Sequence, residues 1–196
     1  MPAQWTVRPA TPADVEPIAA LRATVLRADL ERLGRYDDHR VRQRLRDAFT
    51  PQHTSVILVG GAFAGCVAVR PAGKEGRWLE HFYLDPAVQG RGIGSAVLRT
   101  LLRHADADGV PVRLNVLQGS PAQRLYARHG FTVQTQDPVD VFMLRRPGGV
   151  SGSDVFSGPG AVSGPGGAAA ASTTAGPGRR TAAAAAPPPA TRQARR

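Results

Sequence analysis

The stretch "WLEHFYLDPAVQGRGIGSAVL", residues Trp78–Leu98, places a strand, a glycine-rich loop and the start of a helix in direct succession. Its first seven residues are mostly aromatic or apolar and end at Asp85-Pro86, which is typical of a strand that stops at a turn. Apolar residues then return at helical spacing, which predicts a helix over Ser95–Ala107. The segment in between, Gln89–Gly94, carries three glycines, and each of them loses more backbone freedom on folding than any other residue.

A loop of small residues before a helix presents unpaired backbone N–H groups and the positive end of the helix dipole to its surroundings. Phosphate is the usual ligand of such a loop. Side chains at Gly90, Gly92 or Gly94 would keep a pyrophosphate away from these amides, while Gln89 and Arg91 would add donors. A tight turn without a ligand is the alternative, and the loop by itself does not decide between the two.

Similar patterns predict the other elements. We expect strands over Trp5–Arg8, Ser55–Val59, Ala62–Arg70, Trp78–Leu84, Val112–Leu117, Phe131–Gln136 and Val141–Leu144. We expect helices that begin at Thr11–Asp14, at Asp38 (to Phe49), at Ser95 and at Ser120 (to His129). Pro17 lacks a backbone donor, so the first helix should either kink or start later. This order predicts an α+β fold: a mixed, mostly antiparallel sheet with a central β-α-β crossover and flanking helices.

Composition divides the chain into two parts. Residues 151–196 contain 13 Ala, 8 Gly and 6 Pro and a single aromatic residue, which is too little apolar surface to offset the entropy of ordering. We therefore expect a globular domain over residues 1–148 and a disordered tail over 149–196. The net charge of +10 favours anionic partners. The arginines of the tail are not interleaved with aromatic residues, so nucleic acid is not an expected partner.

Several classes of protein are not expected. Cys66 is the only cysteine, so there is no internal disulfide, and the histidines lack metal-ligand spacing. The N-terminus does not have the pattern of a signal peptide, and no run of eighteen apolar residues occurs. We expect a soluble cytoplasmic protein, monomer or homodimer, with neither a metal nor a membrane partner.

Two motifs in the chain resemble those of the GNAT superfamily of N-acetyltransferases. The pattern Gln-x-x-Gly-x-Gly after a strand ending in Leu-Asp-Pro is similar to the acetyl-CoA loop of that superfamily. The segment "NVLQGSPAQRLYARHGF", Asn115–Phe131, resembles its strand–loop–helix ending in Leu-Tyr-x-x-x-Gly-Phe. The resemblance covers about residues 4–145 and leaves the tail without a counterpart. It implies acetyl-CoA as co-substrate and direct attack of a primary amine on the thioester in a ternary complex.

The resemblance also implies roles for particular residues. Tyr126 matches the acid that assists the leaving thiolate, and the strand backbone around Phe82–Leu84 should bind the developing oxyanion. The implied cofactor-binding residues are Phe82, Tyr83, Leu84, Gln89, Gly90, Arg91, Gly92, Ile93, Gly94, Ser95 and Ser120. Many members have Asn at the position of Ser120, where its side chain contacts the pantetheine arm. For Ser120 we expect an ordinary helix N-cap instead.

Glu80 and His81 compete for the role of general base, and a water molecule held by either is a further alternative. Strand alternation puts the two on opposite faces unless a bulge intervenes. We favour Glu80, which by alternation shares a face with Phe82 and Leu84. A surface ion pair with an arginine is the other interpretation of this carboxylate.

The acceptor is not identified by the sequence. Residues Arg27–Arg40 and the helix from Asp38 occupy the region that shapes the acceptor site in the superfamily. If the arginines there face the cleft, an acidic group on the acceptor is implied; a solvated helix face is the alternative. Arg113 and Asn115 either line the acceptor pocket or meet solvent. We favour a small or amino-acid-like amine, and a protein amine stays open.

Two other functions are alternatives to an acetyltransferase. An S-adenosylmethionine methyltransferase would place the glycine loop after its first strand, whereas here several strands come earlier. A non-catalytic acetyl-CoA-binding module is the alternative that remains.

Overall fold

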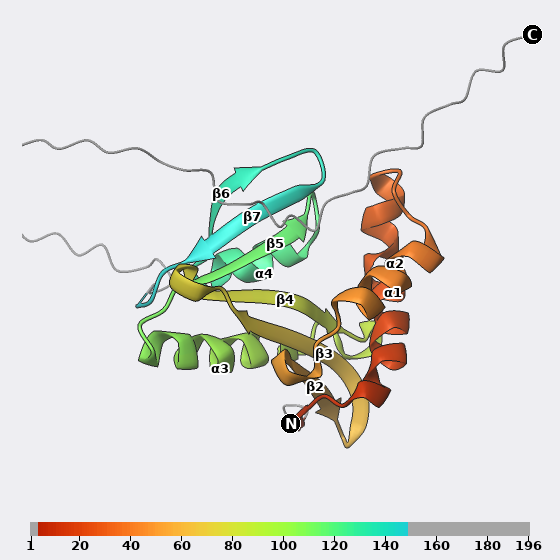
Figure 1. The fold of residues 1–196 in the computed structure, drawn as a ribbon, viewed down its shortest axis with the longest axis horizontal. Helices are drawn as coiled ribbons and strands as arrows, with labels where there is room; N and C mark the ends of the chain where they lie inside the picture. The colour runs from red at the N-terminus through yellow and green to blue at the C-terminus, as the bar shows by residue number, and fades with distance from the viewer. Residues whose placement is uncertain (1–3, 149–196) are drawn as a thin grey trace, which may run out of the picture. The chain divides into compact units, whose positions relative to one another are not determined.

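The computed structural model describes residues 4–148, which form a seven-stranded mixed sheet with four α-helices (Figure 1). The strands are β1 (Trp5–Pro9), β2 (Thr54–Val59), β3 (Ala62–Pro71), β4 (Arg77–Leu84), β5 (Val112–Leu117), β6 (Thr132–Gln136) and β7 (Asp140–Arg145). The helices are α1 (Val15–Arg32), α2 (Asp38–Ala48), α3 (Ile93–Ala107) and α4 (Ala122–Arg128). The predicted α+β class and the mixed sheet are confirmed. The predicted tail lies outside the described residues.

The strands follow the order β1-β2-β3-β4-β5-β7-β6 across the sheet. All neighbours are antiparallel except β4 and β5, which are parallel and joined by α3. This is the predicted crossover. Gly60 and Gly61 both have positive φ, as a two-residue hairpin turn between β2 and β3 requires.

The two parallel strands stay together for only two residue pairs. Arg77 is opposite Val112 and Trp78 is opposite Arg113, and no further pair joins β4 to β5. Beyond this point β5 is paired along its whole length with β7, and β4 continues beside β3 to Leu84. Figure 1 shows β4 and β5 diverging. The second half of β4 therefore has a sheet edge that no described strand covers.

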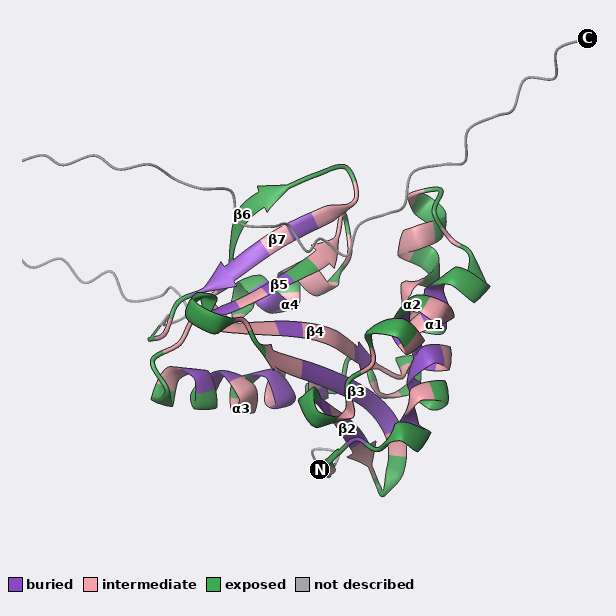
Figure 2. Ribbon diagram, viewed as in Figure 1, coloured by how far each residue is buried: buried purple, intermediate pink, exposed green. Residues whose placement is uncertain are grey.

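Apolar residues form one core on each face of the sheet. The larger core joins α3 and α4 to the sheet and includes Leu98, Leu114 and Phe131. The smaller core joins α1 and α2 to β2, β3 and β4 and includes Ile18, Leu45 and Cys66. Figure 2 shows the buried side of α3 turned toward the sheet. The side chains on the two faces of β4 thus pack into different cores.

The start of α1 explains how Pro17 is accommodated. A 3₁₀ turn, Pro12–Asp14, comes first, and α1 begins at Val15. Pro17 then lies in the first helical turn, where its backbone nitrogen would have no intrahelical acceptor. Of the two predicted outcomes, a kink or a later start of the first helix, the structure has the later start. The Asp14 carboxylate, which is buried, accepts hydrogen bonds from the Arg8 guanidinium at 2.7 and 2.9 Å and from Thr11 N at 2.7 Å.

The boundaries of α2, α3 and α4 also differ from the predicted ones. α3 begins at Ile93 rather than Ser95, because Gly92 takes a left-handed conformation at the N-cap and lets the helix start at once. α4 spans Ala122–Arg128, whereas the prediction ran from Ser120 to His129, and α2 ends at Ala48 rather than Phe49. Between residues 4 and 148 no helix combines the length and the apolar character that a membrane span requires.

Candidate active site

The glycine loop connects the end of β4 to α3 and opens onto empty space. Gly90 and Gly92 have φ of +73° and +78°, and a Cβ added at either would have no atom of residues 4–148 within 4 Å. Gly94 differs, since a Cβ there would lie 3.3 Å from the Leu84 side chain and 3.7 Å from that of Leu125. Gly94 thus allows α3 to pack closely, whereas Gly90 and Gly92 leave the backbone accessible to a ligand.

The first turn of α3 supplies donors beside this loop. The first intrahelical hydrogen bond runs from Ala96 N to Gly92 O at 3.0 Å, and Gly92 has no side chain to cap the amides before it. The N–H groups of Ile93, Gly94 and Ser95 therefore have no acceptor within the helix. Gln89 supports the loop, because its side-chain amide donates to Leu84 O at 2.8 Å. Together with the helix dipole, these amides form a site suited to an anion.

A bulge in β4 changes the faces of its polar residues. Tyr83 is opposite Cys66 and Glu80 is opposite Ala68, so His81 and Phe82 share one partner position on β3. His81 has φ of +51°, in the left-handed region that non-glycine residues seldom adopt. The prediction that Glu80 shares a face with Phe82 and Leu84 is therefore wrong. The extra residue reverses the alternation between them.

The cores show the resulting faces of β4. Phe82 and Leu84 pack against the α3 core, whereas Tyr83 belongs to the α1 core. His81 lies with Tyr83, since its Nδ1 is 3.3 Å from the Tyr83 hydroxyl. Glu80 lies on the same α1 side, opposite Ala68. Both candidate bases thus face one side of the sheet, beside the uncovered edge of β4.

On the α1 side of β4, Glu80 is charged and has an arginine partner, whereas His81 is uncharged. Glu80 accepts a hydrogen bond from Arg70 at 3.2 Å, and the Arg70 guanidinium also lies 5.6 Å from the Trp78 ring centroid. Burial, together with the positive charges of Arg22 and Arg70, lowers the pKa of His81 to about 4. The imidazole is therefore neutral at neutral pH.

Tyr126 reaches the same region from the other core. It is buried on α4 and packs edge-on against Phe131 with ring centroids 5.6 Å apart. Burial raises the pKa of its phenol above the usual range, and the nearby Tyr83 adds to this effect. Tyr83 belongs to the opposite core. Tyr126 is a protonated donor at any physiological pH.

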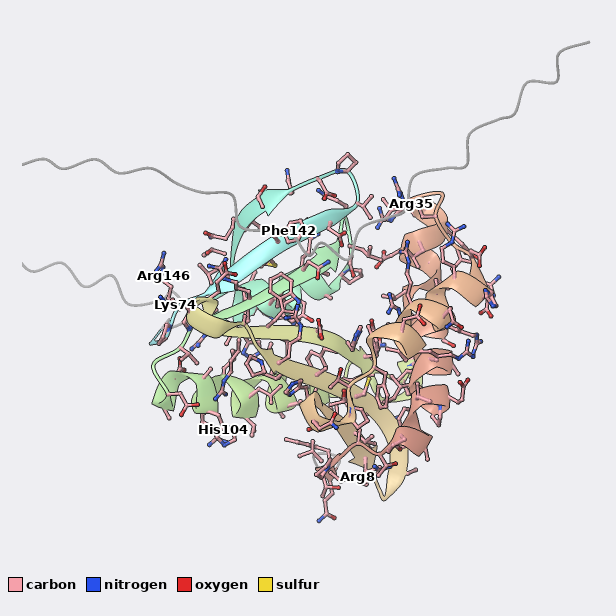
Figure 3. All side chains as sticks on the ribbon, viewed as in Figure 1. Arg8, Arg35, Lys74, His104, Phe142 and Arg146 are labelled. Carbon is pink, nitrogen blue, oxygen red and sulfur yellow. The ribbon has the colours of Figure 1, made fainter. Side chains whose placement is uncertain are left out.

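The other predicted residues have local partners. The Ser120 hydroxyl accepts from Ala122 N at 3.4 Å. The N-cap of α4 is Pro121, without a side-chain cap hydrogen bond, so the expectation that Ser120 is the N-cap is wrong. Asn115 donates to Asp140 at 2.9 Å, and Arg113 lies 3.8 Å from the Glu75 carboxylate. The face of β5 and β7 that carries Asn115 is not covered by α1 or α2, and the half-buried Phe142 stands on it (Figure 3).

The arginines of α2 do not all point to a ligand. Arg42 pairs with Asp38 at 2.7 Å and Arg46 with Glu16 at 2.8 Å. At the end of α1, Arg32 donates to the carbonyl of Gln118 and so connects α1 to the loop after β5. These three guanidinium groups hold the helices in place, which favours the structural interpretation of the arginine-rich segment.

One charged residue of this region was missed by the sequence interpretation. Arg22 lies one helical turn after Ile18, within the apolar stripe that packs α1 onto the sheet. Its Nε is buried and has no hydrogen-bond partner among residues 4–148. A charged residue at a core-facing position of an amphipathic helix was the signal that could have identified it.

No group of His, Cys, Asp and Glu within the described range could hold a metal ion. Comparison with known structures finds a PaiA N-acetyltransferase from Thermoplasma acidophilum, solved with coenzyme A, at 16% identity and a TM-score of 0.60, covering 73% of this chain and 99% of that one. It also finds Ard1 from Thermoplasma volcanium (22%, TM-score 0.55, 72% and 97%) and an N-acetyltransferase from Staphylococcus aureus Mu50 (20%, TM-score 0.56, 71% and 98%). These likenesses show a common fold.

No curated protein matches the chain in sequence. The model of the acetyltransferase (GNAT) family, in contrast, matches residues 20–131, more than half of the chain. The matched range contains the bulged strand, the glycine loop and the helix of Tyr126. The chain belongs to the GNAT acetyltransferase family.

Proposed function

We propose that this protein is an acetyl-CoA-dependent N-acetyltransferase that acetylates the primary amine of a small, amino-acid-like acceptor. The observation that carries the proposal is the open glycine loop, whose free amides lie next to the uncovered edge of β4. The family match and the coenzyme A bound to the PaiA relative support it.

The geometry of the loop supports acetyl-CoA as its ligand. Gly90, Arg91 and Gly92 with the amides of Ile93–Ser95 would hold the pyrophosphate, because both left-handed glycines border open space. The backbone of Phe82–Leu84 would pair with the pantetheine amides, as a peptide adds to a sheet edge. One N–H of this edge would also stabilise the oxyanion, a contribution worth about 10²–10³ in rate in other enzymes. Ser120 would lie beside the pantetheine arm.

Acetyl-CoA supplies a thioester whose C–S bond breaks as the C–N bond to the amine forms, so one proton leaves the nitrogen and one is needed at sulfur. Tyr126 is our donor toward sulfur. A phenol with a pKa near 10 is a weaker acid than a thiol near 8.5, which makes full transfer uphill by about 2 kcal/mol. Burial increases that difference. Tyr126 therefore acts chiefly through a hydrogen bond to the thiolate.

Glu80 is our candidate for the group that takes the proton from the amine, directly or through water. It faces the α1 side of β4, and Arg70 holds its carboxylate in place at 3.2 Å. His81 is the second candidate. Its lowered pKa, about 4, makes the imidazole a weak proton acceptor in the unliganded protein.

Ligand-dependent thermal stability tests the cofactor first. At about 100 times Kd a ligand adds roughly 2.7 kcal/mol, and a chain of this size gains about 2–4 °C per kcal/mol. We expect the midpoint to rise with acetyl-CoA and not with S-adenosylmethionine. No rise at saturating acetyl-CoA would remove the basis of the proposal. Release of free thiol in the presence of amines then separates an enzyme from a non-catalytic acetyl-CoA-binding module, which would show the rise without turnover.

We also propose that residues 1–148 suffice for this activity. A chain ending at residue 148 should retain the kcat and KM of the full-length protein. Loss of acetyl transfer in the shortened chain would give residues 149–196 a role in the reaction.

A further inference from the structure

Arg22 has a position that stability does not explain. α1 packs against β3 and β4, and Arg22 follows the fully buried Ile18 by one turn on the packed side. Its Nε is shielded from water and makes no hydrogen bond within residues 4–148. Leaving a buried donor unsatisfied costs about 1–3 kcal/mol. A ligand with an acceptor atom at this position would satisfy the group.

The other arginines of α1 behave differently. Arg27 pairs with Glu31 at 2.8 Å, and Arg32 pairs with Asp29 at 3.0 Å. Both pairs form on the helix surface, between residues three or four positions apart. For Arg22 no ion pair is present in the described part of the chain, so the helix places two arginines for surface pairing and one toward the sheet.

No anion on the sheet balances the charge of Arg22. Arg22 is on the side of α1 that packs against β3 and β4, and its charge influences the pKa of the Cys66 thiol, the His81 imidazole and the Tyr83 phenol. All three are neutral near pH 7, because burial raises the pKa of the thiol and the phenol to about 12 and lowers that of the imidazole. Two acids on this face have other partners: Glu80 is hydrogen-bonded to Arg70, and Asp140 of β7 accepts a hydrogen bond from Asn115 at 2.9 Å.

A second unsatisfied atom lies in the same place. His81 Nε2 is buried without a partner, while Nδ1 is 3.3 Å from the Tyr83 hydroxyl. If the hydroxyl donates to Nδ1, then Nε2 carries the proton and is a donor as well. Within the described part of the chain, two buried nitrogens without partners, one of them cationic, thus lie on the side of β4 that carries Glu80.

We propose that Arg22 binds a carboxylate of the acceptor, so that the substrate is an amine that also carries a carboxylate. This inference rests on the proposed function and specifies its substrate class. A planar guanidinium matches a carboxylate in two parallel hydrogen bonds. A single unbalanced guanidinium suits a group of one negative charge, whereas a phosphate dianion would require further cationic groups.

Matched pairs of amines test the inference. The full-length protein, saturated with coenzyme A, is titrated with glycine, leucine, phenylalanine, glutamate, lysine, β-alanine and 4-aminobutyrate, each against its carboxamide. Replacement of one charged hydrogen-bonding group changes affinity by about tenfold or more. We expect at least one acid to bind more tightly than its amide by that factor, and the same acid to show the higher kcat/KM in acetyl transfer.

Variants of α1 identify the residue responsible. Arg22→Gln should reduce the preference for the acid to less than about threefold, chiefly through KM, and Arg22→Lys should keep part of it. Arg27→Gln is the matched control on the same helix and should retain the full preference. Because Arg22 satisfies nothing in the unliganded protein, Arg22→Gln should melt no lower than wild type, while a structural arginine would lower the midpoint.

Three results would overturn the inference: no pair in which the acid is preferred, an acid preference that survives Arg22→Gln, or tighter binding of phosphoethanolamine than of β-alanine. Failure of the proposed function looks different. In that case acetyl-CoA would not raise the melting temperature of wild type or of Arg22→Gln, whereas failure of this inference alone leaves that rise intact in both.

Discussion

Substitution of Gly92 by Ala tests the glycine loop more directly than any change of a charged residue. Gly92 has φ of +78°, and its absent Cβ would meet no protein atom. The change therefore introduces no clash in the unliganded protein. An L-residue in this conformation costs about 1–2 kcal/mol, which lowers the melting midpoint by about 2–4 °C per kcal/mol.

Gly109 provides a control for the stability lost when an L-residue takes a left-handed backbone conformation. It follows the other end of α3, has φ of +64°, and also has nothing within 4 Å of an added Cβ. Gly109→Ala should therefore lower the midpoint by a similar amount. Only Gly92→Ala places a methyl group where the pyrophosphate would approach the amides. Losing one hydrogen bond to a charged group costs about 1.5–3 kcal/mol, so we expect acetyl-CoA affinity to fall about 10- to 150-fold.

Calorimetric titration of the three proteins with acetyl-CoA measures the difference. The Gly109 variant should bind like wild type, which separates loss of affinity from loss of stability. If the Gly92 variant binds acetyl-CoA within about threefold of wild type while both variants lose the same stability, the loop does not hold the pyrophosphate.

Three further predictions concern titratable residues. Tyr126→Phe should lower kcat with little change in acetyl-CoA affinity, and turnover equal to wild type would exclude it as the donor. Asp14→Asn should lower the free energy of unfolding by about 1–3 kcal/mol. The Arg8 guanidinium, and to a smaller extent the hydrogen bonds from Thr11, hold the pKa of the Asp14 carboxyl well below its usual range. That stabilisation is present above the ordinary pKa of about 3.9 and is lost as pH falls below it, so urea curves of wild type and variant should converge in acid. His81 has a lowered pKa of about 4, so the unfolded state binds more protons between about pH 6.5 and 4. Stability should therefore fall through that window as pH drops, and a parallel fall in His81→Gln would contradict this.

Most of the fold could be predicted because it depends on local patterns. The hairpin at Gly60-Gly61, the strand before Asp85-Pro86 and the amphipathic α3 each have a period or a turn signal within a few neighbouring residues. The start of α3 was missed by two residues, since a glycine N-cap has no side chain to mark it.

The glycine loop and the position of Tyr126 were likewise available from the sequence, through two motifs that keep fixed distances along the chain. The faces of Glu80 and His81 were not. Alternation has a period of two, and a single extra residue reverses it. Whether a strand contains a bulge depends on the register with its partner β3, which no segment of β4 encodes alone.

The sequence by itself determined the element order, the family and the loop that is suited to a phosphate. Each of these depends on patterns among residues that are close together in the chain. The tertiary structure alone decided which charges meet. Arg46 pairs with Glu16 on another helix, and Arg70 pairs with Glu80 on the neighbouring strand. Arg22 packs onto the sheet and has no acidic partner among residues 4–148. Pairing of charges depends on distances of a few ångströms between segments far apart in the chain, and only folding sets those distances.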